Sequence, residues 1–142
     1  MAGCIVVGVG GDGSGDAAAR TAARVANMMG VELVLVFGYE AVAMGPRGGP
    51  LEEQMLAVGD EAVASLRAAL SHDYPDLTID AAMVQQRPVD ALIAVAEQRD
   101  AEAIVVGHGG AGPLKAALLG SITYEMVHRA PLPVLVVPDD EE

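Results

Sequence analysis

The residues with the clearest chemical potential form a glycine-rich connection at 107–123, GHGGAGPLKAALLGSIT. The connection follows the apolar run AIVV at 103–106, which predicts a buried strand, and it leads into a helical pattern at 122–130. Glycines let a ligand approach the backbone, and free N–H groups at the start of a helix attract anions. We therefore expect a ligand that carries phosphate groups at this connection.

The residue types within the connection suit such a ligand. Gly107 and Gly110 would let the chain pass close to a ribose and to phosphates. His108 and Lys115 could each meet a phosphate, although a solvated lysine is the simpler interpretation of Lys115. N–H groups and two hydroxyls would be presented at the helix start by Gly120, Ser121, Ile122 and Thr123. Ser121 also has a structural interpretation, because serine is a favoured N-cap residue.

A second glycine-rich loop follows the first apolar run. Gly8, Gly10 and Gly13 match G-x-G-x-x-G between a predicted strand and a predicted helix, which is the expected context of a dinucleotide-binding loop. The motif alone is weak in a chain with 17 glycines. Asp12 or Ser14 could equally be a simple helix cap.

Strand-like and helix-like patterns alternate along the whole chain. This alternation predicts an α/β fold, a three-layer α/β/α sandwich with a five-stranded parallel sheet and right-handed crossovers. Within it, the run at 77–84 alternates apolar and polar residues, as a half-buried or edge strand does, and the helix at 51–70 carries a stripe that includes Val58, Leu66 and Leu70. The predicted strands are 4–9, 32–37, 77–84, 103–106 and 134–137, and the predicted helices are 16–29, 51–70, 88–98 and 122–130.

Composition excludes several classes of partner. The chain has 142 residues, which suits a single domain over 1–142, and its formal net charge is −12 with only eight basic residues. Such a charge disfavours nucleic acids and anionic membranes, both of which are bound through lysine and arginine clusters. No metal-ligand spacing of Cys, His and Asp is present, and the single Cys4 rules out a disulfide within the chain. The N-terminus lacks the pattern of a signal peptide, and we expect a cytoplasmic protein.

The spacing of the long connection is specific. Two residues separate Gly107 from Gly110, nine separate Gly110 from Gly120, and Ser121 follows. This pattern resembles the signature G-x2-G-x9-G-[S/T] of the ATP-binding branch of the universal stress protein family. The resemblance extends over nearly the whole chain, including the closing pattern APLPVLVV at 130–137.

The resemblance implies a Rossmann-like sheet of the adenine nucleotide alpha hydrolase-like type, with strand order 3-2-1-4-5. It also implies a bound adenine nucleotide, ATP, with Mg²⁺ bridging the phosphates. Family members often have V-D-G-S in the first loop, with the aspartate on the nucleoside, so Asp12 is a candidate ligand of the nucleotide. Gly10 and Gly11 separate Asp12 from Val9, which is two residues more than the family pattern has.

The resemblance further implies a regulatory protein that forms a homodimer through the apolar strand at 134–137. No nucleophile–base pair and no P-loop lysine pattern stand out, so we expect nucleotide binding with slow hydrolysis at most. Two alternatives stay open at this point. One is a small NAD- or FAD-binding domain that uses the Gly8-Gly10-Gly13 loop, and the other is a structural dimer that has lost its ligand.

Overall fold

The computed structural model describes residues 3–10, 15–40, 49–108 and 120–138. Their strands form one parallel sheet in the order β3-β2-β1-β4-β5. The predicted α/β class and the order 3-2-1-4-5 are therefore confirmed, and β3 is an edge strand. The strands are β1 (Cys4–Gly8), β2 (Glu32–Gly38), β3 (Ile79–Val84), β4 (Ala103–Gly107) and β5 (Val134–Val137), and the helices are α1 (Asp16–Met29), α2 (Gly49–Asp73), α3 (Pro88–Gln98) and α4 (Ser121–Arg129).

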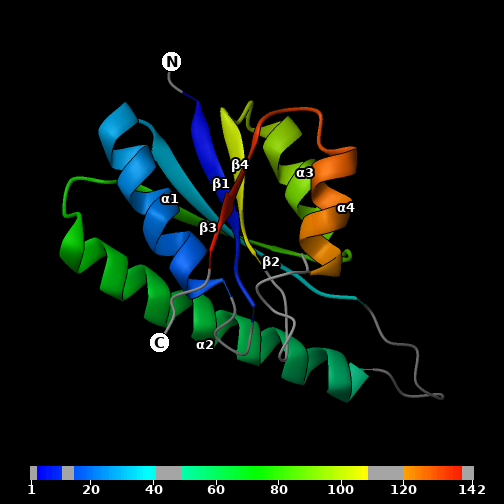
Figure 1. The fold of residues 1–142 in the computed structure, drawn as a ribbon. Coiled ribbons are helices and arrows are strands. Elements are labelled where there is room, and N and C mark those ends of the chain that lie inside the picture. Colours follow the sequence, from blue (N-terminus) through cyan, green and yellow to red (C-terminus); the bar gives the residue numbers. More distant parts are fainter. Residues whose placement is uncertain (1–2, 11–14, 41–48, 109–119, 139–142) are drawn as a thin grey trace.

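Helices cover both faces of the sheet, so the fold has the three predicted layers. Helices α1 and α2 lie on one face, and α3 and α4 lie on the other (Figure 1). Side chains alternate between these faces along each strand. In β1, Ile5 and Val7 join the core beneath α1 and α2, whereas Val6 joins the core beneath α3 and α4. Burial on both faces is what a parallel sheet with crossover helices requires.

Alanine side chains let α1 lie close to the sheet. The helix ends at Gly30, whose φ of 73° lies in the left-handed region that glycine adopts at little cost. The N–H groups of Gly30 and Val31 donate to the carbonyls of Asn27 and Ala26, which closes the last turn. Helix α1 faces the sheet through five buried alanines, Ala18, Ala19, Ala22, Ala23 and Ala26.

Helix α2 departs from the predicted stripe in one respect. Leu66 and Leu70 are buried, but Val58 is 50% exposed. Gly59 turns toward the sheet instead, and a Cβ atom at this position would overlap the ring of Phe37. The close approach of a helix backbone to an aromatic ring therefore replaces an aliphatic contact. None of the described helices is long and apolar enough to cross a membrane.

Four charged side chains join α3 to α4, which lie side by side (Figure 1). The Arg87 guanidinium contacts Glu125 Oε2 at 2.9 Å and Asp90 Oδ2 at 3.3 Å. Arg129 contacts Asp90 Oδ1 at 2.8 Å and also pairs with Glu125. Each carboxylate thus accepts from two arginines. The hydrogen bond from Arg129 first, and that from Arg87 second, hold the pKa of both Asp90 and Glu125 below their ordinary values.

The stability that this network contributes should disappear in acid. A carboxyl group whose pKa is lower in the folded state stabilises the fold above its unfolded pKa of about 4, and this effect is lost as the pH falls through the folded pKa. The double variant Asp90→Asn/Glu125→Gln should therefore melt below the parent at pH 7, with a gap that narrows as the pH falls through the lowered folded pKa values of the two carboxyl groups.

Thermal unfolding followed by circular dichroism between pH 2.5 and 7 measures this gap. The matched control is Asp60→Asn/Glu61→Gln, which alters two exposed acids of α2 that form no ion pair with described residues. A gap that stays constant over the whole pH range would contradict the assignment.

Candidate functional site

The carboxyl ends of the parallel strands meet at one edge of the sheet. The chain runs from β1 outward to β2 and β3, and later from β4 outward to β5, so the strand order reverses between β1 and β4. Gly8 ends β1 and Gly107 ends the neighbouring β4. Ligands of open α/β sheets bind at such a switch point, beyond the strand ends. Both glycine-rich segments of the sequence are thus anchored at the same place.

The connection between β4 and α4 leaves and returns at one point. The N–H of His108 donates to the carbonyl of Val137 at 2.8 Å, and the N–H of Gly120 donates to the carbonyl of His108 at 3.0 Å. These two bonds form a closed neck at the ends of the connection. They bring His108 and Gly120, which are twelve positions apart in the sequence, into direct contact.

The first turn of α4 offers free backbone donors. Gly120 is the N-cap, with φ −67° and ψ 161° and no side chain to cap the helix. Ser121 is the first helical residue, so its interpretation as the N-cap is wrong. The N–H groups of Ser121, Ile122 and Thr123 have no partner among the described residues. Ser121 and Ile122 are exposed. This turn can therefore receive an anion at the positive end of the helix dipole.

Thr123 differs from its neighbours because its side chain points inward. It is 2% exposed, and its hydroxyl donates to the carbonyl of Gly107. The ladder between β1 and β4 ends at Val105, two residues before Gly107. The hydroxyl thus fastens the start of α4 to the end of β4 and fixes the direction of the free N–H groups.

The structure brings six of the predicted site residues together around the neck. They are Gly107, His108, Gly120, Ser121, Ile122 and Thr123. Asp12 and Gly110 lie outside the described residues, as does Lys115. Within the described ranges, no group of three or more His, Cys, Asp or Glu side chains could hold a metal ion.

Two glycines in the segment from β1 to α1 are required by close packing. A Cβ atom at Gly8 would lie 3.2 Å from Leu92 Cδ1, so this residue is small because α3 packs against it. Gly15, which the sequence analysis did not single out, has a φ of 92°, and a Cβ there would lie 2.6 Å from the carbonyl oxygen of Gly8. The turn from β1 into α1 therefore needs glycine at position 15. Packing thus accounts for Gly8, one of the three glycines of the G-x-G-x-x-G match, without a dinucleotide.

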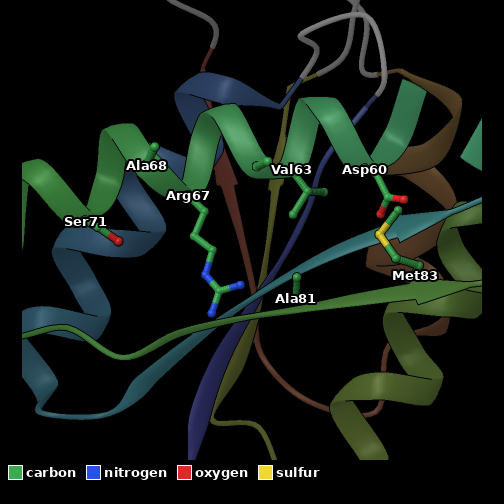
Figure 2. A pocket seen from close by; sticks show the side chains of 8 residues that line it. Asp60, Val63, Arg67, Ala68, Ser71, Ala81 and Met83 are labelled. Atoms are coloured by element: carbon green, nitrogen blue, oxygen red, sulfur yellow. The ribbon is translucent and has the colours of Figure 1, made fainter. Parts of the chain in front are cut away.

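A groove of about 470 Å³ lies away from the neck, between α2 and the edge strand β3 (Figure 2). Strands β2 and β1 separate β3 from β4, so this groove is not part of the switch point. It is lined by Asp60, Val63, Ala64, Arg67, Ala68, Ser71, Ala81 and Met83.

Removal of the Thr123 hydroxyl should destabilise the fold. In Thr123→Val the shape of the side chain is kept, but the half-buried carbonyl of Gly107 loses its donor, which should lower the free energy of unfolding by about 1–3 kcal/mol. Thr123→Ser should recover most of this loss. Urea unfolding is the measurement, and Thr21→Val, on a half-buried threonine of α1 with no hydrogen bond of its hydroxyl to described residues, is the control. Equal stability of Thr123→Val and Thr21→Val would refute the role of the hydroxyl.

Comparison with known proteins agrees with the resemblance in the sequence. The model of the universal stress protein family matches residues 1–138. A universal stress protein of Mycobacterium tuberculosis is 33% identical over 135 residues, covering 93% of this chain and 44% of the relative. One from Thermus aquaticus is 34% identical over 128 residues, covering 89% of this chain and 93% of the relative. The chain thus spans less than half the length of the mycobacterial relative.

Solved structures agree as well. A universal stress protein in complex with cAMP superposes with a TM-score of 0.66 at 27% identity, covering 95% of each chain. One from Archaeoglobus fulgidus in complex with dAMP gives a TM-score of 0.70 at 19% identity, covering 93% of this chain and 94% of the other. From the family match, the relatives and the shared fold, we conclude that this chain belongs to the universal stress protein family.

Proposed function

We propose that this chain is a regulatory protein that binds an adenine nucleotide at the neck between β4 and α4. The observation that carries the proposal is the row of free N–H groups at Ser121, Ile122 and Thr123 beside Gly107 and Gly120. Backbone donors can hold phosphates without a cluster of cations, which suits a chain with a net charge of −12.

The choice of an adenine nucleotide rests on the position of the neck and on the relatives. The neck lies at the switch point of the sheet, where nucleotides bind in folds of this class. Two structural neighbours were solved with cAMP and with dAMP, each of which joins an adenine to a phosphate. ATP is the nucleotide we propose, with Mg²⁺ bridging its phosphates and the Asp12 carboxylate on its nucleoside.

Binding without rapid turnover is the activity we propose. Two charged side chains of α4 are already engaged, since Glu125 pairs with Arg87 and Arg129 pairs with Asp90. The hydroxyl of Thr123 is bonded to the backbone. These three side chains of α4 are thus already engaged within the fold. Phosphate release should stay far below the ~10 s⁻¹ typical of enzymes.

A side chain at Gly120 should block nucleotide binding and leave the fold intact. The backbone of Gly120 lies in the extended region that every residue type adopts, so Gly120→Val introduces no backbone strain. The valine should keep phosphates away from the neck and lower the ATP affinity at least tenfold, or about 1.4 kcal/mol. Calorimetric titration with ATP and Mg²⁺ measures this loss.

Ala69→Val, on the exposed side of α2, is the control and should bind like the parent. If Gly120→Val folds and still binds ATP as the parent does, the nucleotide site lies elsewhere. If the parent binds NADH and not ATP, the Gly8-Gly10-Gly13 loop was the better guide to function.

We also propose a homodimer through β5. This strand ends the sheet, and Leu135 is 41% exposed. The carbonyl of Pro133 accepts from Ile104 in β4, and that of Val137 accepts from His108, just after β4. The N–H and C=O groups of Val134 and Val136 therefore point away from β4, to the open side. An apolar edge of this kind pairs readily with another strand, and a two-fold axis would let the same strand serve in both chains.

One substitution separates this pairing from the integrity of the sheet. Val136→Pro removes an outward N–H donor and leaves the donors that face β4 in place, so it should split a dimer without breaking the β4–β5 ladder. Val136→Ala keeps the donor and is the control. Light scattering should give the parent and Val136→Ala twice the chain mass of 14.5 kDa, and Val136→Pro the single mass. A single mass for the parent at tens of micromolar would disprove the dimer.

A further inference from the structure

The opposite edge of the sheet, β3, exposes a different set of backbone groups. The carbonyl of Thr78 accepts from the N–H of Leu33 in β2 at 2.9 Å, and that of Val84 accepts from the N–H of Tyr39, just after β2, at 3.0 Å. Backbone groups alternate in direction along a strand, so the N–H and C=O groups of Ile79, Ala81 and Met83 point to the open side. An edge of small and apolar residues with free backbone groups is a template for another strand.

One side chain closes the middle of this edge. Asp80 Oδ1 accepts a hydrogen bond from the N–H of Ala81 at 2.8 Å, so the central outward donor is already used. The other carboxylate oxygen, Oδ2, accepts from Arg99 Nη1 at 2.8 Å. These bonds bend the carboxylate around the strand edge, where it occupies the position that an incoming carbonyl would need.

Rigid elements hold this arrangement in place. Arg99 is the C-cap of α3, and its own N–H donates to the carbonyl of Val95. Its hydrogen bond to the carboxylate is the main reason that the pKa of Asp80 is lowered, so the carboxylate stays ionised at neutral pH. On the other face of the sheet, the Arg67 side chain points from α2 toward β3, and Arg67 and Ala81 line the same groove (Figure 2). Charged groups therefore flank the edge on both faces.

The groove beneath α2 explains why the edge needs to be closed. Ala81 and Met83 line it and are only half-buried, so the side chains of an added strand would find these two apolar residues there. A copy of this chain offers such a strand in β5, which has no charged residue. Pairing of β5 with β3 of the next chain would be head-to-tail and would not close into a dimer.

We propose that Asp80, anchored by Arg99, closes the β3 edge to strand addition by a second copy of this chain and so prevents open-ended assembly. The sheet then has one edge closed to pairing, β3, and one edge open to pairing, β5. This role is independent of nucleotide binding, because β3 lies at the far side of the sheet from the neck.

Amide hydrogen exchange tests the closure in the unmodified protein. The N–H of Ala81 should exchange at least about tenfold more slowly than the N–H of Met83. Both groups point to the open side of β3, but of these two only the N–H of Ala81 donates to a carboxylate. NMR resolves both amides, and Arg99→Gln should narrow the difference by freeing the carboxylate. Equal exchange at Ala81 and Met83 would overturn the proposal.

Substitution tests the consequence for assembly. Asp80→Val removes the carboxylate and should assemble, with rising concentration, to masses beyond the state of the parent in light scattering. The control, Asp60→Val, makes the same chemical change on α2 beside the same groove and should keep the parent mass. The assemblies of Asp80→Val should be smaller when Val136→Pro is added, because β5 then lacks the outward N–H of residue 136.

Circular dichroism and ATP titration accompany these measurements. Asp80→Val should bind ATP like the parent, so a failure of the proposed nucleotide site would leave the assembly result interpretable. A folded Asp80→Val that keeps the mass of the parent at all concentrations would overturn the proposal. If Asp80→Val does not fold, Arg99→Gln provides the same test. The proposal would be overturned if Arg99→Gln keeps the mass of the parent and the exchange rate of the Ala81 N–H is unchanged in it.

Discussion

The parallel direction of all five strands is the constraint on which the rest of this structure depends. Parallel neighbours cannot be joined by tight turns, so each connection crosses a face of the sheet as a helix. The same constraint gathers the carboxyl ends of the strands at one edge. The turn after Gly8 and the connection after Gly107 therefore start side by side, although they are far apart in the sequence.

Three backbone-directed bonds turn this convergence into a defined site. Hydrogen bonds link the end of β5 to His108 and His108 to Gly120, and the Thr123 hydroxyl donates to the carbonyl of Gly107. These bonds to the sheet thus orient the free N–H groups of α4. Backbone N–H groups arranged in this way can bind an anion without a cluster of cations, which is compatible with the acidic character of the chain.

Much of this arrangement could be predicted from the sequence. The alternation of apolar runs predicted the α/β class, and the patterns at 103–106 and 122–130 predicted the strand and the helix that flank the glycine-rich connection. The strand order came only from the resemblance, because periodicity does not say which strands are neighbours. The inward turn of Thr123 could not be foreseen either, since its partner carbonyl lies 16 positions earlier and is brought near by the packing of α4 on β4.

Close packing accounts for the other differences. The stripe in the second helix suggested Val58 as an apolar contact, but only the fold reveals that Gly59 meets the Phe37 ring. The bond of Asp80 to Arg99 depends likewise on α3 ending beside β3, a result of topology. The alternating sequence at 77–84 did predict an edge or half-buried strand, because polar residues in a strand reveal incomplete burial. What closes that edge became visible only with its neighbours in place.

The central claim is that a nucleotide is held at the start of α4. Native mass spectrometry of the freshly purified protein, repeated after addition of ATP and Mg²⁺, tests it most directly. We predict a folded species that carries the additional mass of one adenine nucleotide per chain, either as purified or after the addition. A folded protein that remains at the mass of the chain alone in both samples, or that carries a nicotinamide or flavin dinucleotide instead, would contradict the account.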